Sequence, residues 1–130
     1  MSDCTTEIIT LSFALERAGL VWHPEIGDEV SERTSNQIMI LTDNFSLPPS
    51  HLRRIFLWLP RAEQLIEQIE ARQGIITHVG WINDGSTYGY GAFLKIGDVE
   101  IRATSSSFRL ALAMLLFKFL QFLNPKSVLH

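Results

Sequence analysis

The chain has 130 residues, of which 46% are apolar and 19% charged. That length suits one compact domain with its own core, and the composition excludes a disordered chain. The net charge of −3 and the isoelectric point near 5.7 argue against a general affinity for nucleic acid or anionic membranes.

The first expected element is a helix over residues 6–18, because apolar residues recur at helical spacing from Ile8 to Leu15 and Gly19 follows as a left-handed cap. The N-terminus lacks a basic segment and a small-residue cleavage site, so we expect a helix of the mature domain and no signal peptide. Cys4 is the only cysteine, which excludes an internal disulfide and a multi-cysteine zinc site and favours a reducing, cytoplasmic setting.

The region between this helix and residue 60 has weaker patterns. Residues 20–23, "LVWH", predict a short strand, and the polar, acidic residues 24–36 predict a mobile loop or a ragged hairpin. Residues 37–43 predict a strand, and the two adjacent prolines within 44–52 indicate a loop. For residues 53–59, "RRIFLWL", we favour a strand over a short helix.

The second half gives clearer signals. An amphipathic helix is expected over 61–73, and strands over 75–82, 88–96 and 99–104, joined by Asn-Asp-Gly and Gly-Asp turns. A run of three serines then caps a last helix that ends before Pro125. The whole chain is therefore predicted to form a single two-layer α+β domain, in which about three helices pack on a mainly antiparallel sheet and the second half has the order α-β-β-β-α.

The last helix is apolar around almost its whole circumference. Between Phe108 and Leu123 only Arg109, Lys118 and Gln121 are polar. The segment is shorter than the roughly 20 apolar residues of a membrane span, so we expect no membrane insertion. One side of the helix can cover the sheet, and the other must be covered by the two preceding helices or by another subunit. We expect a homo-oligomer, most simply a two-fold dimer.

No pattern indicates a reaction centre. The histidines His23, His51, His78 and His130 lack metal-ligand spacing, and no GxSxG nucleophile motif occurs. No catalytic residue, no metal ligand and no cofactor is therefore predicted.

The stretch "WINDGSTYGYG", residues 81–91, combines aromatic residues with glycines. It lacks the lysine of a phosphate-binding loop and leads into a strand, so it does not match a nucleotide fingerprint. Its alternation of glycine with Tyr88 and Tyr90 predicts a hairpin with one aromatic face and one bare face. We expect the bare face to lie against the last helix.

From "LPRAEQLIEQIEARQG" onwards, the order of one helix, three strands and a final helix resembles that of double-stranded RNA-binding domains, and the loop lengths are similar. The order is also similar to that of small phage-encoded sandwich domains. In the RNA-binding family a lysine cluster at the start of the last helix grips phosphates, whereas Ser105, Ser106 and Ser107 occupy those positions here. The resemblance therefore implies the fold and only weak phosphate-driven affinity. Basic side chains elsewhere that could contact RNA are those of Arg53, Arg54 and Arg61.

The leading functional hypothesis is a non-enzymatic, bacterial or phage-type module that acts by protein association, either with itself or with another protein. Its surfaces would be the aromatic hairpin face of Trp81, Tyr88 and Tyr90 and the apolar last helix. The alternative is a small-ligand pocket between the sheet and the acidic 24–35 loop. Its convergent groups would be Trp22, His23, Asp28, Trp58, His78 and Trp81.

Overall fold

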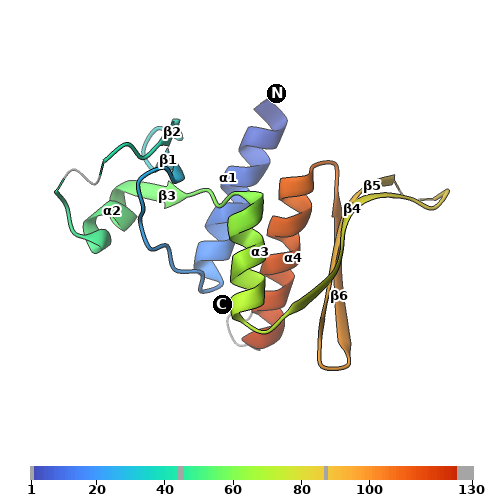
Figure 1. Cartoon of the computed structure of the whole chain (residues 1–130). Helices are drawn as coiled ribbons and strands as arrows, with labels where there is room; N and C mark the ends of the chain where they lie inside the picture. Colours follow the sequence, from blue (N-terminus) through green and yellow to red (C-terminus); the bar gives the residue numbers. More distant parts are fainter. Residues whose placement is uncertain (1, 44–45, 87, 126–130) are drawn as a thin grey trace.

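The computed structural model describes residues 2–43, 46–86 and 88–125. Within them, four helices and six strands form an α+β fold, and both the fold class and the α-β-β-β-α order of the second half are confirmed (Figure 1). In chain order the elements are α1 (Ser2–Arg17), β1 (Glu29–Glu32), β2 (Ile38–Ile40), α2 (Pro49–Ile55), β3 (Phe56–Trp58), α3 (Ala62–Ala71), β4 (Ile75–Asn83), β5 (Tyr88–Ile96), β6 (Val99–Ser105) and α4 (Phe108–Leu123).

The strands are divided between two antiparallel sheets instead of one. One sheet has the order β2-β1-β3, and the other is the meander β4-β5-β6. Helices α1, α3 and α4 lie side by side between them, with the meander on one side and the small sheet and α2 on the other (Figure 1). The two sheets therefore contact the helical layer from different sides.

Helix α4 is the centre of the main core. Eight of its residues are buried, and among them Leu112, Leu115, Leu116 and Phe119 have no exposed surface. The helix contacts α1, α3 and the meander, so elements of the same chain cover most of its apolar circumference, while Phe108, Phe122 and Leu123 at its two ends stay 40–45% exposed. The internal alternative raised by the sequence is the one observed, and the apolar circumference of α4 does not by itself require a second subunit.

The junction between α3 and β4 is tightly packed. Gln73 adopts the left-handed conformation that closes α3, with φ of 71°. Gly74 is needed for a different reason: a Cβ atom there would lie 2.9 Å from side-chain atoms of both Ile69 and Phe119, which are completely buried. The missing side chain lets β4 start directly against α3 and α4.

The segment after α1 is extended without being a strand. Gly19 has φ of 110°, and the amide of Leu20 bonds back to the carbonyl of Leu15, as in a Schellman cap. Beyond it Leu20 and Trp22 are buried while Val21 and His23 are exposed. The sequence predicted a short strand here, but none of the strands among the described residues includes or pairs with residues 20–23.

The acidic segment forms a hairpin, β1 with β2, which is one of the two alternatives that the sequence left open. Two other expectations for the first half, those for residues 44–52 and 53–59, need correction. The prolines expected to make residues 44–52 a loop instead begin α2: Pro48 is its N-cap and Pro49 its first residue, where no backbone N–H is required. Residues 53–59 consequently contain the end of α2 and only a three-residue strand, β3.

Arg109 ties the helical layer to the small sheet. Its Nε and Nη2 atoms donate to the carbonyls of Pro60 and Leu59 at 2.9 and 2.7 Å, and its Nη1 lies 2.9 Å from a carboxylate oxygen of Glu29 in β1. A second, smaller core of Trp22, Val30, Leu41, Leu52 and Phe56 fills the space between that sheet and α2.

Candidate functional site

Strand β4 forms one edge of the meander. It pairs with β5, and no strand among the described residues pairs with its other side. Its nine residues include no lysine, arginine, aspartate, glutamate or proline. A bulge between Ile76 and His78 disturbs its beginning, but residues 78–83 keep a regular register with β5. A regular strand edge with free backbone groups is thus left open.

The other edge strands carry features that discourage pairing. Natural proteins protect sheet edges with charged residues, proline, bulges or very short strands, because unpaired N–H and C=O groups are a template for another strand. Strand β6, the opposite edge of the meander, contains Glu100 and Arg102. Strand β2, an edge of the small sheet, is only three residues long. By comparison β4 is long and uncharged.

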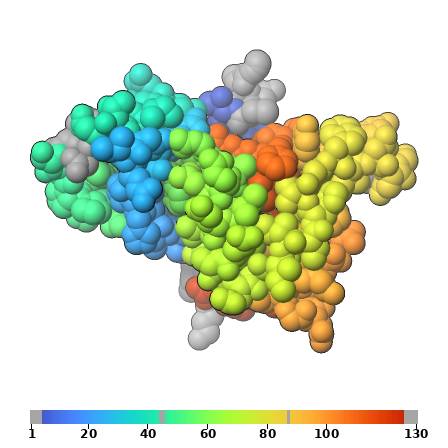
Figure 2. Space-filling view, viewed as in Figure 1, coloured from blue at the N-terminus to red at the C-terminus, as the bar shows by residue number. Residues whose placement is uncertain are grey.

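An aromatic cluster lies on the helix side of this hairpin. Trp81 in β4 is the register partner of Tyr90 in β5, and their rings meet edge to face with centroids 5.3 Å apart. Tyr90 in turn makes an edge-to-face contact of 6.1 Å with Phe108, the first residue of α4. Trp81 is 58% exposed and Tyr88 70% exposed. Figure 1 shows the β4–β5 hairpin, drawn in yellow, extending beyond α4, and Figure 2 shows the same yellow segment at the edge of the molecule.

The bare face of this hairpin does not lie against α4, contrary to our expectation. Tyr90 points to the helix layer, so Gly89 and Gly91 belong to the outer face. A Cβ atom on Gly91 would clash with the side chain of Ile82, and one on Gly89 would lie 2.7 Å from the carbonyl oxygen of Ser105. The glycines therefore accommodate a cross-strand side chain and a neighbouring strand.

His78 is also on the outer face, away from Trp81. Its ring lies 5.0 Å from that of its register partner Phe93, and the guanidinium of Arg102 stacks 4.5 Å above the same phenyl ring. This row crosses all three strands of the meander. These three side chains pack against one another on the outer face of the meander, so His78 does not lie with the other residues of the predicted pocket.

The remaining candidates gather beside the small sheet. Asp28 is 5% exposed and accepts hydrogen bonds from Trp22 Nε1 at 2.8 Å and Gln64 Nε2 at 2.9 Å, as well as from the amide of Glu25 at 3.0 Å. A cavity of about 150 Å³ here is lined partly by His23, Asp28 and Trp58. The structure thus brings together four of the six predicted pocket residues: Trp22, His23, Asp28 and Trp58.

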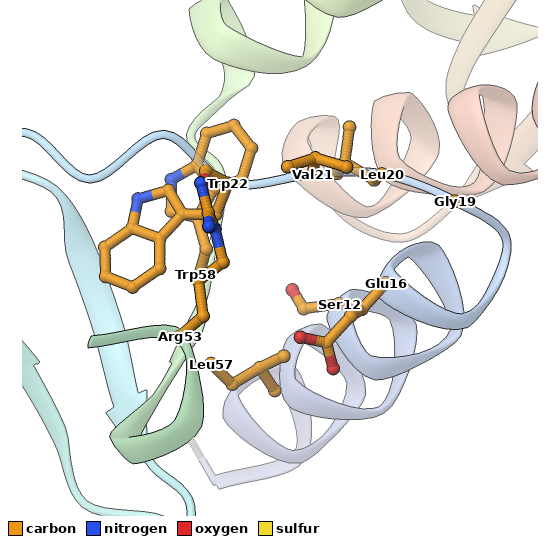
Figure 3. A pocket seen from close by; sticks show the side chains of 9 residues that line it. All are labelled: Ser12, Glu16, Gly19, Leu20, Val21, Trp22, Arg53, Leu57 and Trp58. Carbon is orange, nitrogen blue, oxygen red and sulfur yellow. The ribbon is translucent and has the colours of Figure 1, made fainter. Parts of the chain in front are cut away.

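A larger cavity of about 260 Å³ opens between α1 and two tryptophans, Trp22 in the segment after α1 and Trp58 in β3 (Figure 3). Ser12 and Glu16 line it from α1, and Arg53 lines it from α2. Sequence reasoning did not identify Ser12, although its position signals it: it lies four residues after Ile8 and three before Leu15, on the buried face of α1.

Arg53 and Arg61, which the sequence offered as RNA contacts, are held by backbone carbonyls. Arg53 Nε donates to the carbonyl of Trp22 at 2.7 Å, and Arg61 Nη2 donates to the carbonyl of Gly27. Arg54 is exposed. Two of the three arginines therefore have hydrogen-bond partners within the chain.

The arrangement provides no assembled metal site. Among residues 2–43, 46–86 and 88–125, no group of three or more His, Cys, Asp or Glu side chains could hold a metal ion. His130 lies outside this range. In the same part of the chain no helix has both the length and the apolar character needed to cross a bilayer.

Comparisons of the whole chain with protein-family models, with curated proteins and with solved structures gave no match. The fold and the site geometry described above are therefore the basis for a functional proposal.

Proposed function

We propose that this protein is a non-enzymatic association module that forms a two-fold homodimer by antiparallel pairing of β4 with β4 of a second copy. The observation that carries the proposal is the edge of β4, which has regular register over residues 78–83 and contains no charged residue. The exposed side chains of Trp81 and Tyr88 both lie near the β4–β5 turn.

Self-pairing of β4 satisfies simple requirements of symmetry. An antiparallel pair of identical strands is related by a two-fold axis, so the same surface serves both copies and the assembly closes. The product would be a continuous six-stranded sheet whose helices all lie on one side. The new ladder would satisfy the open N–H and C=O groups of β4, and strand addition of this kind obtains its affinity from main-chain hydrogen bonds.

The aromatic side chains supply apolar area at this interface. A buried aromatic side chain typically removes about 150–250 Å² from water, and tryptophan and tyrosine are enriched among the residues that dominate binding. Trp81 is already oriented by its contact with Tyr90. It therefore loses less side-chain entropy on association than a freely rotating residue would.

The substitution Trp81→Lys tests the proposal. It places a charge beside the edge of β4, and we expect the dimer dissociation constant to rise about tenfold or more, which corresponds to roughly 1.4 kcal/mol. Sedimentation velocity over a concentration series measures this constant. Because Trp81 is 58% exposed, the folded monomer should keep its far-UV circular dichroism.

Ile40→Lys is the matched control, since Ile40 is 51% exposed on β2, an edge strand of the other sheet. This variant should dimerise as the unmodified protein does. Tyr90 is a poorer choice because it packs against the main core. An unmodified protein that stays monomeric at high micromolar concentration, or a Trp81→Lys variant that dimerises normally, contradicts the proposal.

A further inference from the structure

The cavity between α1 and the two tryptophans combines apolar walls with polar groups that lack partners. Leu20 and Leu57 contribute to its apolar lining, and Ser12, Arg53 and Trp58 are among the lining residues whose side chains carry hydrogen-bonding groups. Ligand sites in proteins usually have this composition, with a few convergent polar groups set in an apolar surface.

Two of these polar groups are unsatisfied. Ser12 is 2% exposed, and among the described residues neither its Oγ nor the buried Nε1 atom of Trp58 has a hydrogen-bond partner. In Figure 3 the hydroxyl of Ser12 points from α1 toward the open space in front of the tryptophans. Buried polar groups in native proteins nearly always have a partner, so the pair suggests a missing acceptor.

The charges beside the cavity favour an anion. Both carboxylate oxygens of Glu16 accept hydrogen bonds from Arg33, which offsets the one negative charge in the lining. Arg53 uses its Nε for the carbonyl of Trp22, and in the described part of the chain its Nη atoms make no hydrogen bond. One guanidinium with free donors is left at the cavity, and guanidinium groups bind carboxylates particularly well.

We propose that this cavity binds a carboxylate carried on a small apolar body, with Arg53 and the indole N–H of Trp58 as donors to the carboxylate and Ser12 as a further hydrogen-bonding group. The apolar body would lie against Leu20 and Leu57. A free carboxylic acid and the C-terminal carboxylate of a peptide share this chemistry.

Nuclear magnetic resonance of the three tryptophan indole N–H groups tests the proposal directly. Titration with hexanoate should shift the Trp58 signal and leave the Trp81 signal unchanged, because Trp81 lies on the meander. Hexanamide has nearly the same shape without the charge, and we expect it to bind about tenfold more weakly or not at all. This comparison uses the unmodified protein and does not depend on the folding of a variant.

Trp58→Phe removes the indole donor and should weaken hexanoate binding about fivefold to tenfold, whereas Trp81→Phe should leave it unchanged. A short peptide ending in leucine, compared with its C-terminal amide, identifies the source of the carboxylate. Binding of hexanoate or of the free-acid peptide supports the proposal. Equal binding of acid and amide, or a Trp58 signal that no carboxylate shifts, overturns it and leaves a cavity occupied by water.

Discussion

Phe119→Ala should lower the free energy of unfolding by about 3–5 kcal/mol, the range expected for truncating a buried phenylalanine. Phe119 has no exposed surface and lies in α4 against Gly74, the residue that precedes β4. Helices α1 and α3 and the meander hold α4 on its different sides, so the space left by the ring cannot easily collapse. Urea unfolding followed by circular dichroism measures the change.

Phe122→Ala is the control for this experiment. Phe122 belongs to the same helix, one turn later, and is 45% exposed. Its truncation removes a similar side chain but leaves no enclosed cavity, so the loss should be below about 1 kcal/mol. Similar losses for the two variants would show that α4 is not the centre of the core.

Asp28→Ala should lower the free energy of unfolding by about 2–4 kcal/mol. The carboxylate accepts three hydrogen bonds, and its removal leaves the indole N–H of Trp22, which is only 5% exposed, without an acceptor. An unsatisfied buried donor costs about 1–3 kcal/mol, and hydrogen bonds to a charged group contribute more than neutral ones. Denaturant unfolding again measures the loss.

Two further variants locate the effect. Asp28→Asn keeps the shape but places an NH₂ group where an acceptor is needed, so an intermediate loss is expected. Glu70→Ala removes an exposed carboxylate from α3 and should change stability by less than about 0.5 kcal/mol. If Asp28→Ala were as stable as Glu70→Ala, the hydrogen bonds of Asp28 to Trp22, Glu25 and Gln64 would not contribute to stability.

The second half of the fold could be predicted from sequence because its signals are local. Gly85 and Gly97 have φ of 93° and 59°, the left-handed conformation that glycine adopts readily in tight turns. The amphipathic pattern over 61–73 places α3 within two residues at each end. Ser107 accepts a hydrogen bond from the amide of Leu110 and so caps α4, as its position suggested.

The first half was harder because partners distant in sequence decide its structure. Residues 20–23 have the alternation of a strand, but it is the side chain of Arg53, and not a neighbouring strand, that donates a hydrogen bond to the carbonyl of Trp22. Pro48 and Pro49 suit either a loop or the start of a helix, and the burial of Leu52 in the second core accompanies the helix.

The residues of the candidate site could be named from the sequence, but their positions relative to one another could not all be predicted. Alternation showed that Tyr90 and Gly91 lie on opposite faces, but it could not show which face meets α4. His78 and Trp81 stand three residues apart in β4, so strand alternation alone places them on opposite faces, and the prediction that both line one pocket did not take this into account. The bulge between Ile76 and His78, and the choice of the face that meets α4, depend on tertiary packing, for which the local pattern carries no signal.

Amide hydrogen exchange of β4, measured by mass spectrometry as a function of protein concentration, tests the central claim most directly. Self-pairing predicts that peptides covering residues 75–83 become more protected as the concentration rises through the dimer dissociation constant. Peptides covering β6, the charged edge of the same meander, should exchange at an unchanged rate. Protection of β4 that is independent of concentration, or a change confined to β6, would contradict the account.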